Sequence, residues 1–467
     1  MQILPSGREP VPPGDGALTL APFRGVRYAP DRVSGLAEVT SPPYDVVARD
    51  IADRLMEADP HNVVRLILPR RAPGHPADAY RDAARTLREW LDGKILTRDD
   101  RPGLYVYEQA APGAAGQAPA VIQRGLIGAV RLTPLDAGVV RPHEDVAPGP
   151  VADRLALMEA TQANLEPILL LYAADGLNRG QPGCGGPGQG ARGAAARVIS
   201  QAAGLARPLA DAVTSDGIRH RLWAVTDPAD LAEIAADLAP RTALIADGHH
   251  RYSAYLELQA HLRAAGAGPG PWDYGLALLV DASAYPPDIG AIHRVIPGLE
   301  PGAAVRKAAA AFTVSRLPGG TRRLGEAVET LADASARGPA LLVAGGGAAS
   351  LLTDPDPVQV DAAMPEGRSP RWRGLAASVL QELLLGRIWN DGGGEGNGEG
   401  DVRIVHNDAA EAVRQADEAG GTAVICPPMR ADDVYAVAEQ GERVPRKSTS
   451  FGPKPRTGLV LRTFAQG

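Results

Sequence analysis

The chain has 467 residues, of which 45% are hydrophobic and 22% charged, a composition typical of a folded globular protein. This length exceeds one ordinary hydrophobic core, so we expect two or three domains. The net charge of −7 gives no overall reason to expect nucleic-acid binding, and the two cysteines, Cys184 and Cys426, provide neither a disulfide framework nor a metal-ligand set.

The chain also lacks the sequence features of secreted and membrane proteins. Its N-terminus has no apolar segment typical of a signal peptide. It contains no run of about 18 apolar residues, the length that a membrane-spanning helix needs. We therefore expect a soluble, cytoplasmic protein with no membrane partner.

Helical and strand-like patterns alternate along the chain, which predicts an α+β (mixed α/β) fold. The expected strands are Asn62–Leu68, Leu104–Glu108, Val121–Leu132, Glu166–Tyr172, Arg219–Val225, Tyr274–Val280 and Ala340–Ala344. The expected helices are Val47–Glu57, Ala77–Leu91, Ala152–Ala163, Pro228–Leu238, His250–Ala264, Leu375–Leu385 and Asp408–Ala419.

Two glycine-rich segments interrupt this alternation, near residues 176–190 and 391–400. Ordering them would cost backbone entropy without burying apolar surface, so we predict flexible surface insertions. Neither contains the Gly-x-x-x-x-Gly-Lys-Ser/Thr pattern of a phosphate-binding P-loop. The nearest segment, Gly441–Ser448, lacks the second glycine.

The segment Thr242–Tyr252 carries the most informative pattern. A short apolar run ends in Asp247-Gly248-His249-His250-Arg251, and a helix-like pattern follows at once. We predict that Asp247 is the helix N-cap and that Gly248 allows a tight turn between strand and helix. Because a helix N-terminus has free N–H groups and favours anions, this turn is a candidate phosphate site.

A second polar cluster lies upstream, at His143 and Glu144, followed by Asp153-Arg154 at the head of a predicted helix. The pair could supply a general base or a metal-bound carboxylate. A solvated polar loop is the alternative. Phosphoryl transfer needs an anion site, a carboxylate that tolerates Mg²⁺ and a base near the attacking hydroxyl, and the two clusters together would provide these.

Three further segments are weaker candidates. Pro42–Asp45 predicts a turn before a helix, with Asp45 as a candidate N-cap. His293-Arg294 is predicted at a strand end, where Arg294 could extend an anionic pocket. The hydroxyl-rich basic tail from Lys447 to Lys454 could fold over a phosphate, or it could be a solvated strand region.

Several separated segments resemble one known family when taken in order. They are Ala21–Arg27, Ser41–Val46, Leu104–Gln109, His143-Glu144, Asp153-Arg154, Ile245–Tyr252, Ala291–Val295, Lys447–Lys454 and Gly458–Val460. Over nearly its whole length the chain resembles the bacterial and archaeal family of domain of unknown function 1015. More distantly, the His-Glu pair and the Asp-Gly-His-His-Arg turn resemble the ParB/sulfiredoxin superfamily, and most closely its free-serine kinase branch. The sulfiredoxin branch is disfavoured because no cysteine occupies the turn.

The resemblance implies a ParB/sulfiredoxin-like core with further α/β regions. We place an N-terminal α/β region at 1–120, the core with its Gly/Pro-rich insertion at 121–300, and a C-terminal α/β region with its Gly-rich loop at 301–467. It also implies roles for individual residues. The catalytic residues would be Glu144, as general base, with Asp247 and His143; the nucleotide phosphates would contact Gly248, His249, His250, Arg251, Arg294 and Lys447; and Asp247 would contact Mg²⁺.

Three functional hypotheses follow. The first is a kinase that uses Mg²⁺ with ATP or ADP and phosphorylates a hydroxyl acceptor such as free L-serine. The second is a ParB-like nucleotide-binding or DNA-associated regulatory protein without kinase activity; the absence of a basic helix-turn-helix makes a nucleic-acid partner unexpected. The third is a scaffold in which the histidine-rich turn satisfies buried polar groups.

Overall fold

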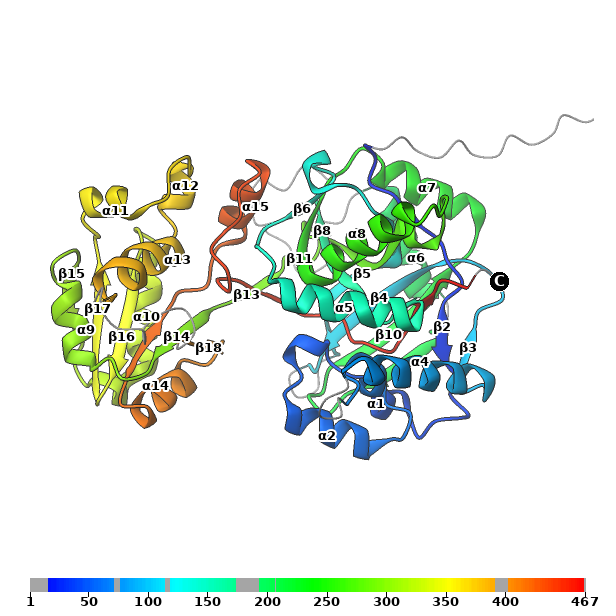
Figure 1. Ribbon diagram of the computed structural model, residues 1–467, viewed down its shortest axis with the longest axis horizontal. Coiled ribbons are helices and arrows are strands. Elements are labelled where there is room, and N and C mark those ends of the chain that lie inside the picture. The colour runs from blue at the N-terminus through cyan, green and yellow to red at the C-terminus, as the bar shows by residue number, and fades with distance from the viewer. Residues whose placement is uncertain are drawn as a thin grey trace, which may run out of the picture. The chain divides into compact units, whose positions relative to one another are not determined.

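The computed structural model describes residues 16–70, 76–113, 118–173, 193–205, 207–390 and 402–465. These residues form two compact units (Figure 1). Unit 1 consists of the described residues within Met1–Pro142, Val146–Pro286 and Pro453–Gly467, and unit 2 of those within His143–Asp145 and Pro287–Gly452. Both units combine helices with β-sheets, mixed parallel and antiparallel in unit 1 and antiparallel in unit 2, which confirms the predicted mixed α/β class.

Unit 1 is built on a nine-stranded sheet with the order β6-β11-β8-β12-β5-β4-β10-β9, and β1 pairs with β5. The pairs β6–β11 and β8–β12 are parallel and the others are antiparallel. The strands are β1 (Leu20–Ala21), β4 (Leu104–Ala111), β5 (Ala120–Arg131), β6 (Val140–Pro142), β8 (Ile168–Tyr172), β9 (Ala210–Val213), β10 (Arg219–Val225), β11 (Ala243–Asp247) and β12 (Tyr274–Asp281).

The central strands β8 and β11 are apolar along nearly their whole length because both faces of the sheet are covered here. Every residue of both strands is buried. Burial on two faces removes the alternation of polar and apolar residues seen in half-exposed strands. Four helices contribute apolar side chains to this core: α5 (Pro148–Thr161), α6 (Ala194–Leu205), α7 (Pro228–Leu238) and α8 (His249–Ala264). Helix α5 packs against α8, beside strands β11 and β8 (Figure 1).

A second core of unit 1 lies among its N-terminal helices. The remaining elements of unit 1 are β2 (Val26–Tyr28), α1 (Leu36–Val39), η1 (Tyr44–Val46), α2 (Arg49–Ala58), α3 (Val64–Ile67), α4 (Pro76–Asp92), β3 (Leu96–Arg98), η2 (Leu135–Ala137), β7 (Ala163–Asn164), η3 (Pro271–Asp273) and β21 (Arg462–Thr463). Strand β2 pairs with β3, and β21 with β7.

Unit 2 contains a six-stranded antiparallel sheet with the order β15-β17-β16-β19-β14-β18, and a separate pair β13–β20. Its strands are β13 (Asp288–Gly290), β14 (Ile292–Ile296), β15 (Thr313–Arg316), β16 (Leu341–Gly345), β17 (Ala348–Thr353), β18 (Arg403–His406), β19 (Thr422–Ile425) and β20 (Ser450–Gly452). Its helices are α9 (Pro301–Ala308), η4 (Gly320–Arg323), α10 (Leu324–Ser335), α11 (Pro357–Ala363), α12 (Pro370–Arg373), α13 (Ala376–Ser378), the π-helix η5 (Val379–Ile388), α14 (Ala409–Glu418) and α15 (Ala431–Glu439).

Most predicted elements occur within a few residues of their expected bounds, but the strand expected at Asn62–Leu68 is wrong. This segment contains the short helix α3 instead. The Asn62 side chain accepts a hydrogen bond from the Val64 N–H at 2.9 Å and donates to the Glu38 and Thr40 carbonyls, which stabilises a turn. Burial of the following β-branched residues therefore outweighs their strand propensity.

The structure departs from two other expectations. The two units do not follow the three predicted regions: β4 and β5, which flank the proposed boundary at residue 120, pair in one sheet. The helix expected at Leu375–Leu385 is a short α-helix that continues as the π-helix η5. The two glycine-rich segments and Cys184 lie outside the described residues. Across the described ranges, no helix is both long and apolar enough to span a membrane.

Candidate functional site

The turn between β11 and α8 is the central feature of unit 1. Gly248 adopts a left-handed backbone conformation, with φ of 94°, and α8 begins at His249. The predicted tight turn at glycine is therefore confirmed. The predicted N-cap is wrong, because Gly248 occupies the cap position and Asp247 is the last residue of β11. No side chain at the cap accepts a hydrogen bond from the first turn of α8.

Gly248 is required at this position for two reasons, which leads to a first prediction. Left-handed backbone costs an L-residue about 1–2 kcal/mol, and a Cβ at Gly248 would lie 2.6 Å from the Ile168 Cγ2 atom. We expect Gly248→Ala to lower the free energy of unfolding by about 2–3 kcal/mol, measured by urea denaturation. Gly266→Ala is the control: φ is 84° but no atom lies within 4 Å, so about 1 kcal/mol is expected. Equal losses for the two variants would contradict the steric contribution of Ile168.

Asp247 holds two cations, one on each carboxylate oxygen. Its Oδ1 lies 2.6 Å from the Lys454 Nζ, and its Oδ2 accepts a hydrogen bond from the Arg251 Nη2 at 2.6 Å. The same Lys454 ammonium lies 2.6 Å from the Asp45 Oδ2. Asp45 sits within η1, so its predicted N-cap role is wrong. Although burial alone would lower it, the two carboxylates raise the pKa of Lys454.

Arg251 is buried beneath the turn, with only 4% of its surface exposed. Besides the bond to Asp247, its Nη1 donates to the Pro167 carbonyl at 2.7 Å. Its Nε is buried and has no hydrogen-bond partner among the described residues. This atom faces the turn, because a Cβ on Gly248 would lie 3.2 Å from it. Burial alone would lower the pKa of Arg251, but the carboxylates of Glu166, Asp247 and Asp45 hold it above its usual range.

Glu166 is a buried carboxylate beside Arg251 that the sequence analysis missed. It accepts a hydrogen bond from the Tyr44 N–H at 2.9 Å and lies 3.7 Å from the Arg154 Nη1. Burial raises the pKa of Glu166, although Arg251 and Arg154 oppose this. The Arg154 guanidinium stacks over the Tyr44 ring at 4.2 Å from its centroid. The only signal in the sequence is a charged residue next to the buried strand β8.

The two histidines of the turn are half-buried at the start of α8. The His250 Nε2 accepts a hydrogen bond from the Ala147 N–H at 3.1 Å. His250 thereby joins the first turn of α8 to the N-cap of α5.

The second predicted cluster lies in unit 2. His143 is buried, with its Nε2 atom 2.9 Å from the Thr449 hydroxyl and its ring 4.9 Å from the Phe451 ring centroid. Burial raises the pKa of the adjacent Glu144, although the backbone N–H and charge of Lys447 oppose this. Arg294, in β14, donates from its Nη2 to the Lys447 carbonyl at 2.8 Å. Each of the predicted residues in this cluster is therefore linked to the segment that precedes β20.

The structure thus groups the predicted residues by unit. Unit 1 holds the turn residues Asp247–Arg251, and it adds Asp45, Glu166, Arg154 and Lys454 to them. Unit 2 holds His143, Glu144, Arg294 and Lys447.

Asp247 does not fit a resident Mg²⁺ site in this arrangement. Both of its carboxylate oxygens are already paired with cations, Lys454 and Arg251. Mg²⁺ requires oxygen ligands in near-octahedral geometry and is itself positively charged. Among the described residues, no group of three or more His, Cys, Asp or Glu side chains could hold a metal ion. We therefore assign no step to a metal.

Solved structures with a remote likeness to this chain include a free serine kinase variant in complex with ADP, at 13% identity and a TM-score of 0.33, covering 75% of this chain and 97% of that one. C-terminally truncated SbnI from Staphylococcus aureus is 13% identical, with a TM-score of 0.34 and coverage of 71% and 86%. A conserved hypothetical protein from Pyrococcus furiosus is 12% identical, with a TM-score of 0.32 and coverage of 72% and 94%.

These likenesses are too remote to say what this chain binds or does. No curated protein matches the chain. The family described as "Protein of unknown function (DUF1015)" matches residues 20–181 and 189–378, well over half of the sequence. The chain therefore belongs to the DUF1015 family, as its separated motifs predicted.

Proposed function

We propose that this protein binds a nucleotide and transfers a phosphoryl group from ATP or ADP to a hydroxyl acceptor such as free L-serine. The observation that carries the proposal is the first turn of α8. Its N-cap is a left-handed glycine with no side-chain cap, and the unpartnered Nε of buried Arg251 faces that glycine. A helix N-terminus without a side-chain cap presents N–H donors to an anion, and its dipole favours negative charge.

The nucleotide phosphates would meet the backbone of Gly248, His249 and His250. Lys454 adds charge next to this turn, and two of its three ammonium donors are used by Asp45 and Asp247. Arg251 acts in this proposal as a positioning residue, because its two terminal nitrogens hold Asp247 and Pro167.

The residues of unit 2 would supply the base. A general base works best when its pKa approaches the working pH, and burial moves the pKa of Glu144 in that direction. We propose that Glu144 accepts the proton of the acceptor hydroxyl. His143 would position Glu144 through its bond to Thr449, and Arg294 and Lys447 add positive charge beside Glu144. Arg294 and Lys447 are further candidates for contact with a phosphate.

Nucleotide binding is tested by thermal unfolding with ATP, ADP, CTP and GTP, each with and without Mg²⁺. A nucleotide at 100 times its dissociation constant should add about 2.7 kcal/mol to the free energy of unfolding. We expect Lys454→Met to reduce this ligand-induced gain, and Lys94→Met, at an exposed lysine of the same unit, to leave it unchanged. If no nucleotide stabilises the protein, the proposal is wrong.

Transfer is tested separately, by mass spectrometry of reactions with a panel of hydroxyl metabolites that includes L-serine. Nucleotide binding without any phosphorylated product would refute the kinase and favour the ParB-like regulatory alternative. Salt-dependent binding to duplex DNA would then identify a DNA-associated protein.

A further inference from the structure

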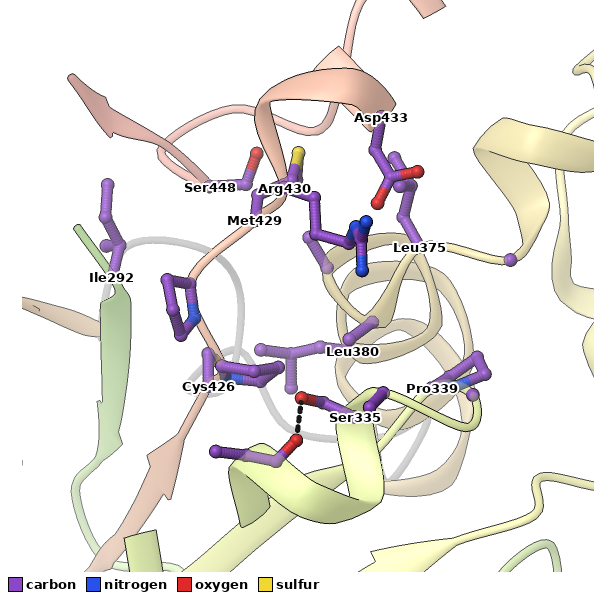
Figure 2. Close-up of a pocket in the computed structure, with 18 of the residues that line it drawn as sticks. Ile292, Ser335, Pro339, Leu375, Leu380, Cys426, Met429, Arg430, Asp433 and Ser448 are labelled. Atoms are coloured by element: carbon purple, nitrogen blue, oxygen red, sulfur yellow. Dashed lines mark hydrogen bonds between the residues drawn. The ribbon is translucent and has the colours of Figure 1, made fainter. Parts of the chain in front are cut away.

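Unit 2 contains a pocket of about 640 Å³ that the proposed phosphoryl transfer does not use as a catalytic site (Figure 2). Its volume lies within the usual range of small-molecule sites, about 300–1,000 Å³. All of its lining residues belong to unit 2 and lie between Ile292 and Ser448. They come from β14, from the ends of α10 and β19, and from α12, α13, η5 and α15.

The lining of the pocket combines apolar side chains with several arginines. Ile292, Leu375, Leu380 and Met429, together with several alanines and prolines, form an apolar wall. The charged lining residues are four arginines, Arg294, Arg337, Arg371 and Arg430, and a single acid, Asp433. Glu144 interacts with Arg294 and Asp433 pairs with Arg371, so Arg337 and Arg430 remain as a local excess of two positive charges in a chain whose net charge is −7. This excess favours an anionic ligand.

The charged lining residues differ in their partners and in their exposure. Arg371 is paired with Asp433 at 2.6 Å, which neutralises part of its charge. Arg430 is exposed, and Figure 2 shows its side chain and that of Asp433 extending into the same space. Arg294 is only 6% exposed, so its charge acts in a less screened environment.

We propose that this pocket binds a small organic anion with an apolar body, whose carboxylate or phosphate meets the arginines while its body contacts the apolar wall. Arg294 also takes part in the proposed phosphoryl transfer, but Arg337, Arg371, Arg430 and the apolar wall do not, so this inference does not depend on that function. It follows from the joint presence of volume, apolar wall and unbalanced positive charge.

The probe is 8-anilinonaphthalene-1-sulfonate, an apolar anion that fluoresces when bound, compared with the neutral N-phenyl-1-naphthylamine. We expect the anion to bind saturably and the neutral compound to show no saturable binding. Arg430→Gln should weaken it about threefold and Asp433→Asn should tighten it about threefold, as for partly exposed charges. Arg316→Gln, an exposed arginine of β15 outside the pocket, should change nothing. Equal effects of all three substitutions would overturn the proposal.

Competition distinguishes the two anion types: benzoate carries a carboxylate and phenyl phosphate a phosphate on the same body. The stronger competitor identifies the preferred group, and displacement by benzyl alcohol as strong as by either anion would overturn the proposal.

The location of the bound anion is checked with Cys426, a lining residue whose thiol pKa is raised by burial to about 11. In a Cys184→Ser background, the bound anion should slow alkylation of Cys426. Ala376→Leu should fill the pocket and abolish both signals; unchanged binding would place the probe elsewhere.

Discussion

Replacing Arg251 with methionine is expected to lower the free energy of unfolding of the protein by about 3–5 kcal/mol, the usual loss when one partner of a buried ion pair is removed. Methionine keeps much of the aliphatic volume of arginine, so the loss reports mainly on charge. The guanidinium is buried and bonded to the Asp247 carboxylate and the Pro167 carbonyl. Without it, Glu166 loses the neighbouring positive charge that opposes the effect of its burial.

The pH dependence of this loss separates charge from packing. In the folded protein burial already raises the pKa of Glu166, and removing Arg251 raises it further. A carboxyl group with a raised folded-state pKa destabilises the protein as the pH rises through that value, and it does not do so below its unfolded pKa of about 4.3. The difference between wild type and Arg251→Met should therefore shrink as the pH falls from 7 toward 4.

The control is Arg263→Met on the same helix. Arg263 pairs with Asp273 at 2.8 Å, but its side chain is 60% exposed, so a loss of at most about 1 kcal/mol is expected. Both variants are compared with wild type by urea denaturation at several pH values. Equal losses at the two positions, or a difference that does not change with pH, would show that Arg251 does not neutralise buried carboxylates.

Elements whose pattern reflects burial could be predicted from the sequence. Strand β10 and helix α7 have the predicted bounds, β12 differs by one residue at its C-terminal end, and β5 is shifted by one residue at both ends. Their apolar residues follow the periodicity of the element itself. Helix α3 could not be predicted in this way, because its conformation depends on Asn62 reaching the carbonyls of Glu38 and Thr40, residues distant in sequence. Such contacts leave no periodic signal.

The candidate site could also be predicted only in part. The glycine turn could be predicted, since Asp-Gly between an apolar run and a helix pattern demands a special backbone conformation. The distant members of the site could not: Lys454, which pairs with Asp247, comes from more than 200 residues further along the chain, and Glu166, which lies beside Arg251, comes from before β8. The prediction of an aspartate N-cap failed because Asp247 pairs with Lys454 and Arg251. Local capping preference was outweighed by these two ion pairs.

Glu144→Gln should reduce phosphoryl transfer by about 100- to 10,000-fold, the range for loss of a general base, while nucleotide binding stays within about twofold. The amide keeps the shape of the side chain but cannot accept the proton of the hydroxyl.

In the wild-type protein kcat/KM should fall at low pH. The pH at which this acid limb lies should be above the usual pKa range of a glutamate, because burial raises the pKa of Glu144. Asp145→Asn, at the neighbouring half-buried carboxylate, is the control and should keep both rate and acid limb. Transfer that survives Glu144→Gln with the acid limb in place would exclude Glu144 as the base and leave proton removal to another group.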